Sequence, residues 1–469
     1  MAITGKKTNQ DDVDERISIV EGQTQYQSRC PDRYDSESIK DIMPPAGLQD
    51  PFIGEEGAQI QYRITGVNDG NQALCYIDDS SVSLLRGPFT PVIHGDIGIC
   101  PVRFTDTLGT SGCILIVAIG ALTTYTGYVL GQFKVRHPQI HNMSDAAEIL
   151  FGAWGREIIT IAQIIFFVFL MGAHILTFSI MMNTLTNHAA CTILFCLAGT
   201  VLTFVLTLSR RLQEVSYLGI ISSLSIVIAV MITVVAIGIE APDPRAYAIG
   251  HPTLLSGFSA ALNIIISFAG HLAFFSFQSE LAEPKDFTKA LVALQVTDTS
   301  LYLVAAVVIY RYAGAGVKSP ALLSTSPVVA KVAFGVAVGT IVIAGVIIGH
   351  VGAKTIYVRL FRGTRRMNER TLVSYGTWVI IVLVLWTIAW VIANAIPVFN
   401  DLLNLLAAAF GSWFSFGLEG LFWLHMNREL RSARQIALAG LNVFLVLLCC
   451  FIVSETSYKW ELKPLRGDF

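Results

Sequence analysis

The chain has 469 residues, of which 53% are hydrophobic and only 14% are charged, and its mean hydropathy is +0.60. Soluble domains carry about 25% charged residues, so most of this chain is expected to lie in lipid and a soluble enzyme is disfavoured. No basic stripe with interleaved aromatic residues is present, which argues against a nucleic-acid partner. The eight cysteines lack the paired C-x-x-C spacing of a zinc site, so we expect buried free thiols, no metal and no cofactor.

Residues 1–111 form a polar region that differs from the rest of the chain. They hold 17 acidic and 9 basic residues, and residues 1–30 contain no apolar run of the kind that marks a secretory signal. Roughly the first fifty residues have the composition of a disordered segment. Residues 64–111 show no persistent period, and we assign them no fold. We therefore expect three parts, which are this region, a transmembrane domain at 112–455 and a short tail at 456–469.

From Gly112 onward the chain alternates between long apolar segments and short polar loops. Each segment has about 20 residues, which is the length that an α-helix needs to cross the hydrocarbon core. Gly and Ser are frequent within the segments, as in helices that pack closely in lipid. The sequence thus predicts ten spanning helices, at 112–133, 157–183, 190–208, 216–239, 256–280, 294–314, 333–353, 376–395, 402–424 and 435–453.

The loop charges orient these helices, because Lys and Arg concentrate in cytosolic loops. Loops after the odd-numbered segments carry sixteen Lys and Arg and the opposite loops carry four, so the odd-numbered exits are expected to be cytosolic. Ten spans would then place both tails outside, although the N-terminal region has no signal that would carry it across. One more spanning helix before Gly112 would remove this conflict, but residues 1–111 contain no apolar stretch of that length.

The segment at 256–280 is unusual because polar residues lie at its centre. Asn263, Ser267 and His271 interrupt the apolar run, and Gly270 precedes the histidine. A charged group at this depth costs roughly 2.5 kcal/mol or more, so such residues tend to be functional. The combination is typical of a broken transport helix, whose freed backbone groups meet a polar substrate inside the bilayer. The alternative is a histidine that hydrogen-bonds a neighbouring helix.

Several long stretches resemble one family, in order along the chain. The run FAGHLAFFSFQSELAEPKDFTKAL at 268–291 is similar to the sixth helix and following loop of the amino acid/auxin permease family, in its fungal neutral amino acid permease branch. The resemblance covers about residues 112–455. The other stretches that agree are TYTGYVLGQF at 124–133, MGAHILTFSIMMNTLT at 171–186, LQVTDTSLYLVAAVVIY at 294–310 and TIVIAGVIIGHVGAKTIYVRLFRG at 340–363.

The resemblance implies an all-α polytopic membrane protein with the LeuT-like inverted-repeat transporter fold. Family members have eleven transmembrane helices, and the broken first and sixth helices hold the substrate near the bilayer midplane. The run GEEGAQIQYR at 54–63 is similar to the family's sequence just before its first helix, and the pattern resumes near Cys113. We therefore expect about ten helices here, with the first one missing. Either a gene-model or splicing fault over 64–111 or a genuine variant without this helix would explain it.

The same resemblance places the substrate at the break of the sixth helix. Freed carbonyl groups there could accept hydrogen bonds from a substrate ammonium, while the alternative is a kinked but continuous helix. His174 and Thr177, three residues apart on one helix face, are further substrate-binding candidates, as is Gly345, for which close helix packing is the simpler account. The residues of the break are Ser267, Phe268, Ala269, Gly270 and His271.

Two ionisable residues are candidates for coupling transport to protons. His271 is one, because histidine titrates near neutral pH, although a packing hydrogen bond is the more usual fate of such a residue. Glu419 is the other, because it lies inside the apolar run FGSWFSFGLEGLFWL. Glu419 could instead lie close enough to the cytosolic end to reach water or Arg428.

Three classes of function follow. The leading one is a secondary transporter of neutral amino acids, driven by protons and working by alternating access, with the substrate class and coupling ion implied by the resemblance alone. The second is a non-transporting membrane sensor that binds amino acids, or an inactive product that lacks the first helix. A membrane enzyme is the third, and it is disfavoured because no nucleophile–base pair, metal cluster or nucleotide loop is evident. We expect a multi-pass protein of the plasma membrane rather than the vacuolar membrane, with neutral amino acids, protons and the bilayer as partners.

Overall fold

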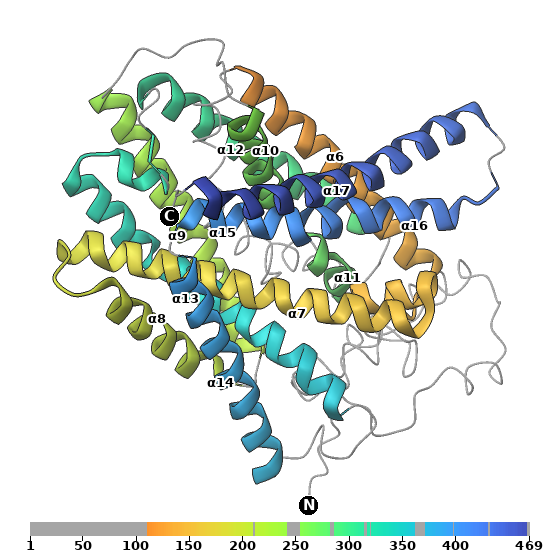
Figure 1. Cartoon of the computed structure of the whole chain (residues 1–469), viewed down its shortest axis with the longest axis horizontal. Helices are drawn as coiled ribbons and strands as arrows, with labels where there is room; N and C mark the ends of the chain where they lie inside the picture. Colours follow the sequence, from red (N-terminus) through yellow and green to blue (C-terminus); the bar gives the residue numbers. More distant parts are fainter. Residues whose placement is uncertain are drawn as a thin grey trace, which may run out of the picture. The chain divides into compact units, whose positions relative to one another are not determined.

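The structure, a computed structural model, is helical throughout the part of the chain that it describes (Figure 1). The expectations for residues 1–109, including the missing first helix, lie outside this part. The part of the chain that the structure describes comprises residues 110–209, 212–241, 254–281, 286–313, 317–318, 320–361, 371–396, 398–429 and 432–466.

Each of the ten predicted spans coincides with one helix or with a run of consecutive helical elements, which are α10 and α11 for 256–280 and α15, η5, η6 and α16 for 402–424. Nine helical stretches within the described ranges are long and apolar enough to cross a membrane, and the tenth, α8, has 16 residues. Helices suit this environment because all their backbone hydrogen bonds are made within one segment. The elements are α6 (Thr110–Arg136), α7 (Met143–Thr186), α8 (Thr192–Thr207), α9 (Leu212–Glu240), α10 (Leu254–Ser267), α11 (His271–Glu280), α12 (Phe287–Ala313), the 3₁₀ turn η3 (Ala321–Ser324), α13 (Pro327–Phe361), α14 (Leu372–Ala395), α15 (Phe399–Leu406), the π-helical turns η5 (Ala407–Gly411) and η6 (Trp413–Gly417), α16 (Leu418–Met426) and α17 (Ala433–Arg466).

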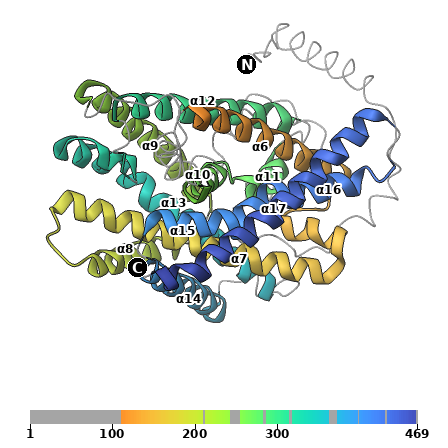
Figure 2. The same ribbon diagram turned by 45° about the horizontal axis from the view of Figure 1, so that its top comes forward.

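The helices pack in two groups. In the first group α6 packs against α10, α11 and α12, and α6 and α12 lie side by side (Figure 2). In the second group α7, α8, α13 and α14 pack against one another, and α9 packs against both α13 and α12. The stretch from α15 to α16 contacts α10, α6 and α7, so it touches both groups. The broken helix therefore lies between α6 on one side and α15 with its π-helical turns on the other.

Glycines on α6 set the close approach to α12. A Cβ atom added to Gly120 would lie 2.5 Å from Thr299 Oγ1, and one added to Gly131 would lie 2.8 Å from the ring of Phe287. Small residues allow this packing, which membrane helices use because lipid gives them little hydrophobic drive to associate.

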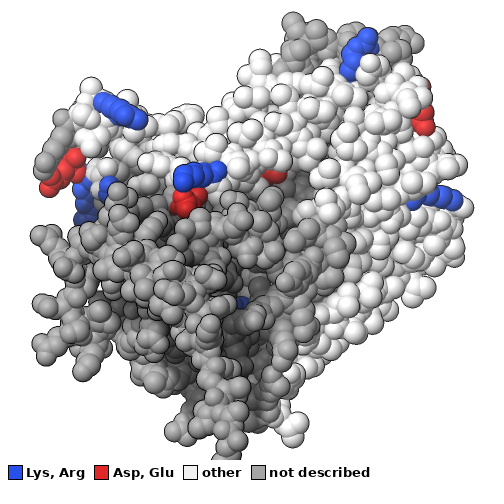
Figure 3. Space-filling view, turned by 180° about the vertical axis from the view of Figure 1, so that it is seen from behind, with Lys and Arg blue, Asp and Glu red and all other residues white. Residues whose placement is uncertain are grey.

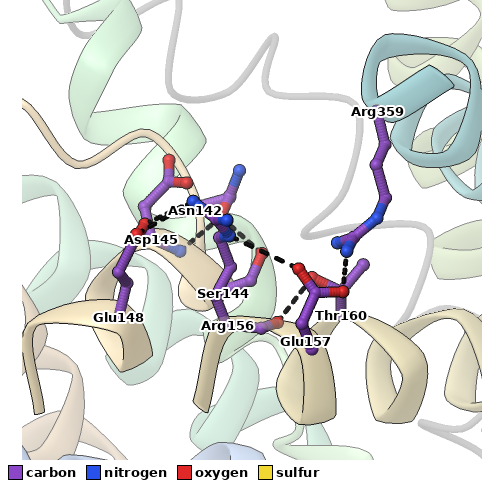
Figure 4. A network of polar contacts seen from close by, with 8 residues as sticks. All are labelled: Asn142, Ser144, Asp145, Glu148, Arg156, Glu157, Thr160 and Arg359. Atoms are coloured by element: carbon purple, nitrogen blue, oxygen red, sulfur yellow. Dashed lines mark hydrogen bonds and ion pairs between the residues drawn. The ribbon is translucent and has the colours of Figure 1, made fainter. Parts of the chain in front are cut away.

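α7 begins earlier than the predicted 157, because Asn142 caps its first turn by accepting a hydrogen bond from the Asp145 N–H at 2.8 Å. Its first part runs to a kink at Gly152, whose φ of 69° favours glycine. Beyond the kink, Arg156 pairs with Glu148 at 2.9 Å (Figure 4). Glu157 in turn contacts Arg359 of α13 (Figure 4). These side chains are a third to two-fifths exposed, so each ion pair contributes at most about 1 kcal/mol.

The described helices present apolar side chains on their outer faces, as a protein in lipid requires. On the face in Figure 3 the described side chains are mostly uncharged, and Lys, Arg, Asp and Glu lie in small separate groups. Large apolar side chains point outward from several helices, including Ile161 of α7, Leu197 of α8, Val384 of α14 and Leu447 of α17. The arrangement is that of a multi-pass integral membrane protein.

Candidate substrate site at a broken helix

The predicted break in the sixth helix of the family is present. α10 ends at Ser267, α11 begins at His271, and the three residues between them are not helical. The N–H of Phe268 donates to the carbonyl of Ile265 at 3.1 Å, and the N–H of Gly270 donates to the carbonyl of Phe268 at 2.9 Å. The usual bonding between residues four apart therefore stops at Ser267 and resumes in α11. The alternative of a continuous, kinked helix is wrong.

All five predicted residues of the break are buried, and Phe268 points toward α6 and α12. Its ring makes an edge contact with Tyr302 of α12, with 5.2 Å between the ring centroids. The Tyr302 hydroxyl donates to the carbonyl of Ser267 at 3.2 Å. On the other side, a Cβ atom on Gly120 of α6 would lie 3.4 Å from the end of the Phe268 ring. Helices α6 and α12 thus hold the break in place.

His271 binds to α6. Its Nε2 lies 3.1 Å from the carbonyl oxygen of Thr123 and 3.0 Å from the hydroxyl of Thr126. A carbonyl oxygen only accepts hydrogen bonds, so Nε2 carries a hydrogen and donates to it. The Thr123 hydroxyl continues the network with a 3.3 Å contact to the side-chain oxygen of Gln295 on α12. The His271 side chain therefore connects α11 to α6, as in the packing alternative, and binding of a substrate by the residues of the break stays a prediction.

A second polar network joins α10 to α15. Asn263 donates to the side-chain oxygen of Asn404 at 2.5 Å, and Asn404 donates to the hydroxyl of Ser259 at 2.6 Å. The Ser267 hydroxyl donates to the carbonyl of Asn263 at 2.8 Å, which ties this network to the break. The Asn263 side-chain oxygen is buried and has no hydrogen-bond partner among the described residues. The network fixes the first half of the broken helix against α15.

Replacing Asn404 with Leu is expected to lower the free energy of unfolding by about 1–3 kcal/mol, because buried polar groups on α10 lose their partner. Thermal unfolding of the purified protein in detergent measures the effect. Asn394→Leu is the matched control, since the Asn394 amide donates to the carbonyl of Trp390 on its own helix. Equal stability losses in the two variants would show that the contact between α10 and α15 contributes nothing.

The other predicted binding residues lie in the second group of helices. A Cβ atom on Gly345 of α13 would lie 3.2 Å from the Cβ of His174 and 3.5 Å from the Trp386 ring of α14. His174 and Gly345 are therefore brought together where α7 meets α13. The Thr177 hydroxyl donates to the carbonyl of Ala173 within α7 at 2.9 Å. Close packing accounts for the glycine, and a role for these residues in substrate binding stays a prediction.

Glu419 lies in the first turn of α16 with no exposed surface. Neither of its carboxyl oxygens has a hydrogen-bond partner among the described residues. Arg428 instead contacts Nδ1 of His425 at 2.9 Å. The alternative in which Glu419 reaches water or Arg428 is therefore wrong, because this part of the helix turns the carboxyl group into the protein.

Several residues at the break were not singled out from the sequence. Each is a polar side chain inside a predicted span, which is the signal that could have found them. They are Thr123, Thr126, Gln295, Tyr302 and Asn404.

A helix that is broken at mid-length and packed between α6 and α15 is the arrangement of membrane transporters of the LeuT-like class. The comparison with solved structures agrees with this fold. The structure of MhsT in complex with L-phenylalanine superimposes with a TM-score of 0.54 at 12% sequence identity, covering 80% of this chain and 98% of that one. The inverted-repeat fold expected from the resemblance is confirmed.

Sequence comparison defines the family. The profile described as transmembrane amino acid transporter protein matches residues 106–459. The N amino acid transport system protein of Neurospora crassa is 34% identical over 361 residues, which cover 74% of this chain and 76% of that protein. A protein of Gibberella moniliformis described as a transmembrane transporter is 30% identical over similar shares of both chains. The chain belongs to the transmembrane amino acid transporter family.

Proposed function

We propose that the chain is a secondary active transporter that moves neutral amino acids together with protons by alternating access. The observation that carries the proposal is the break between α10 and α11, buried inside the protein. Half-helices that end at mid-depth direct backbone carbonyl and N–H groups at a substrate, while the rest of the site stays apolar. A neutral amino acid suits such a site because its ammonium and carboxylate groups need partners of opposite kind and its net charge is zero.

The polar ends of the substrate would then bind to the backbone of the break. The first N–H groups of a helix have no partner within that helix and attract anions, so the start of α11 at His271 suits the carboxylate. Carbonyl groups at the end of α10, near Ser267, suit the ammonium. Phe268 and His271 direct their side chains toward α6 and α12, which leaves backbone as the main recognition element. His174, Thr177 and Gly345 stay candidates for further contacts with the substrate.

The names of similar proteins support the substrate class. The Neurospora crassa relative is named for amino acid transport, and MhsT was solved with L-phenylalanine.

Uptake into liposomes that contain the purified full-length chain tests the proposal. Labelled neutral amino acids are expected to accumulate when the outside is acidic, whereas lysine and glutamate are expected to stay near background. Collapse of the pH gradient with a protonophore is expected to abolish accumulation but to leave exchange of labelled for unlabelled substrate. Equal uptake in protein-free liposomes would overturn the proposal.

Whether the chain contains the first helix of the family decides between transport and its alternatives. A chain that binds neutral amino acids at equilibrium but catalyses no exchange would instead be a sensor or an inactive product. Sequencing the transcript over residues 64–111 separates a gene-model or splicing fault from a genuine variant without this helix, because a message that encodes the same residues excludes the fault.

The plasma-membrane location belongs to the same proposal, and fluorescence microscopy of the tagged chain checks it against the vacuolar membrane.

A further inference from the structure

The interface between α16 and α17 holds a second cluster of buried polar groups, away from the contacts of the break. Glu419 lies at its centre, fully buried and with no hydrogen-bond partner among the described residues. The hydroxyl of Ser415, one turn earlier, and the side-chain oxygen of Asn442 on α17 are also buried, and the described residues offer neither of them a partner. Three such groups on adjoining elements are unusual, because buried polar groups normally find partners.

The helices approach closely at this cluster. A Cβ atom on Gly420 would lie 3.0 Å from the backbone carbonyl of Asn442, so glycine allows α17 to reach the turn that carries Glu419. The Cys449 thiol of α17 interacts electrostatically with Glu419 and donates to the carbonyl of Ser412 at 3.3 Å. The π-helical turns η5 and η6 directly precede Glu419. Such wide turns are frequent at functional sites.

The cluster is connected to the broken helix through α6. The Asn442 amide donates to the hydroxyl of Tyr125 on α6 at 2.7 Å. The next residue of α6, Thr126, contacts His271 of α11 at 3.0 Å. Helix α6 therefore contacts the cluster around Glu419 through Tyr125 and the candidate substrate site through Thr126.

We propose that Glu419 binds and releases the coupling proton. The protonation state of Glu419 then affects the broken helix through the contact between Asn442 and Tyr125. This proposal rests on the proposed function. In the protonated form the carboxyl O–H can donate to an acceptor such as the Asn442 side-chain oxygen or the Ser415 hydroxyl. After the proton leaves, the carboxylate needs donors. The donors nearby on α17 are the Asn442 amide, which already binds Tyr125 of α6, and the Cys449 thiol, which already binds the carbonyl of Ser412 between η5 and η6. Ionisation of Glu419 thus draws the Asn442 amide away from Tyr125 and the Cys449 thiol away from the carbonyl of Ser412.

The titratable groups around Glu419 fit this assignment. Cys449 of α17 interacts with it electrostatically, and Tyr125 of α6 accepts a hydrogen bond from Asn442 of the same cluster. The turns η5 and η6 contain no titratable residue. At the far end of α16, His425 and Arg428 contact each other. The described contacts therefore place no cation beside Glu419 that would hold it permanently ionised.

Glu419→Gln in the full-length chain reconstituted into liposomes tests the proposal. We expect exchange of labelled for unlabelled neutral amino acid at close to the wild-type rate, whereas accumulation driven by an acidic exterior falls by about tenfold or more. Glu419→Asp is expected to restore part of the accumulation, and Asp401→Asn, a matched change on α15 of the same span, is expected to retain it. Undiminished acid-driven accumulation in Glu419→Gln would overturn the proposal, as would a requirement for sodium in place of a pH gradient.

A spectroscopic measurement separates this proposal from the proposed function. Infrared difference spectra of the purified chain between acidic and alkaline pH are expected to show the carbonyl band of a protonated carboxylic acid that Glu419→Gln lacks. Absence of that difference between the two proteins would overturn the proton site even if the chain transports amino acids. Presence of the band in a wild-type chain that catalyses no exchange would overturn the proposed function and leave the proton site in place.

Discussion

Replacing His271 with Ala is expected to give a protein that neither accumulates nor exchanges amino acids at a useful rate. The variant loses two hydrogen bonds to α6 and leaves a cavity behind the break. Together these changes are expected to lower stability by about 2–4 kcal/mol. Uptake is expected to fall by about tenfold or more, because a displacement of about 1 Å in a binding group can cost up to ~10²-fold. Uptake and exchange in liposomes, with thermal unfolding of the same preparation, measure both effects.

Two matched changes show how His271 acts. His271→Gln keeps a donor for the Thr123 carbonyl and is expected to retain acid-driven accumulation within a few-fold of wild type. Thr126→Val removes one contact of the His271 ring, and valine has nearly the size of threonine. This variant is expected to lower uptake less than His271→Ala does. If His271→Gln exchanged normally but no longer responded to pH, His271 would carry the coupling proton and the assignment to Glu419 would be contradicted.

Replacing Gly120 with Val is expected to separate α6 from α12 at the level of the break. The new side chain would meet Thr299 and the end of the Phe268 ring, so Phe268 must leave its place against Tyr302. Overpacking of this kind costs about 1–3 kcal/mol, and the shift of Phe268 is expected to abolish measurable uptake. Thermal unfolding and uptake by the same preparation measure the two effects.

Gly238→Val on α9 is the control for this change. It also adds a branched side chain to an apolar helix, but a Cβ atom there meets nothing within 4 Å. We expect it to retain uptake and nearly all of the wild-type stability. A Gly120→Val protein that transports as well as Gly238→Val would refute the tight packing of α6 behind the break.

The approximate positions of the spans and of the break could be predicted from the sequence, because both depend on local properties, although α7, α13 and α17 extend well beyond the predicted spans. A long apolar run must become a helix in lipid, and the polar and flexible residues around Gly270 mark where such a helix stops. The start of α7 was missed because the stretch 143–151 is more polar than a span and the helix kinks at Gly152, so only the cap at Asn142 signals this start.

The rotation of each helix could not be read in the same way. A helix that is apolar on most sides gives little indication of which face meets the protein and which meets lipid. For this reason the direction of His271 toward α6 and the turning of Glu419 away from Arg428 emerged only from the structure. The pairing of Asn263 with Asn404 joins residues 141 positions apart, and nothing local in either segment predicts it.

The central claim is that the backbone between Ser267 and His271 binds a neutral amino acid. Electron cryomicroscopy of the full-length chain in lipid nanodiscs, with and without a saturating neutral amino acid, tests it most directly. We predict added density at the break, with the carboxylate at the start of α11 and the ammonium at the end of α10. Added density that lies elsewhere, or a continuous helix from α10 into α11 in the bound state, would contradict the account.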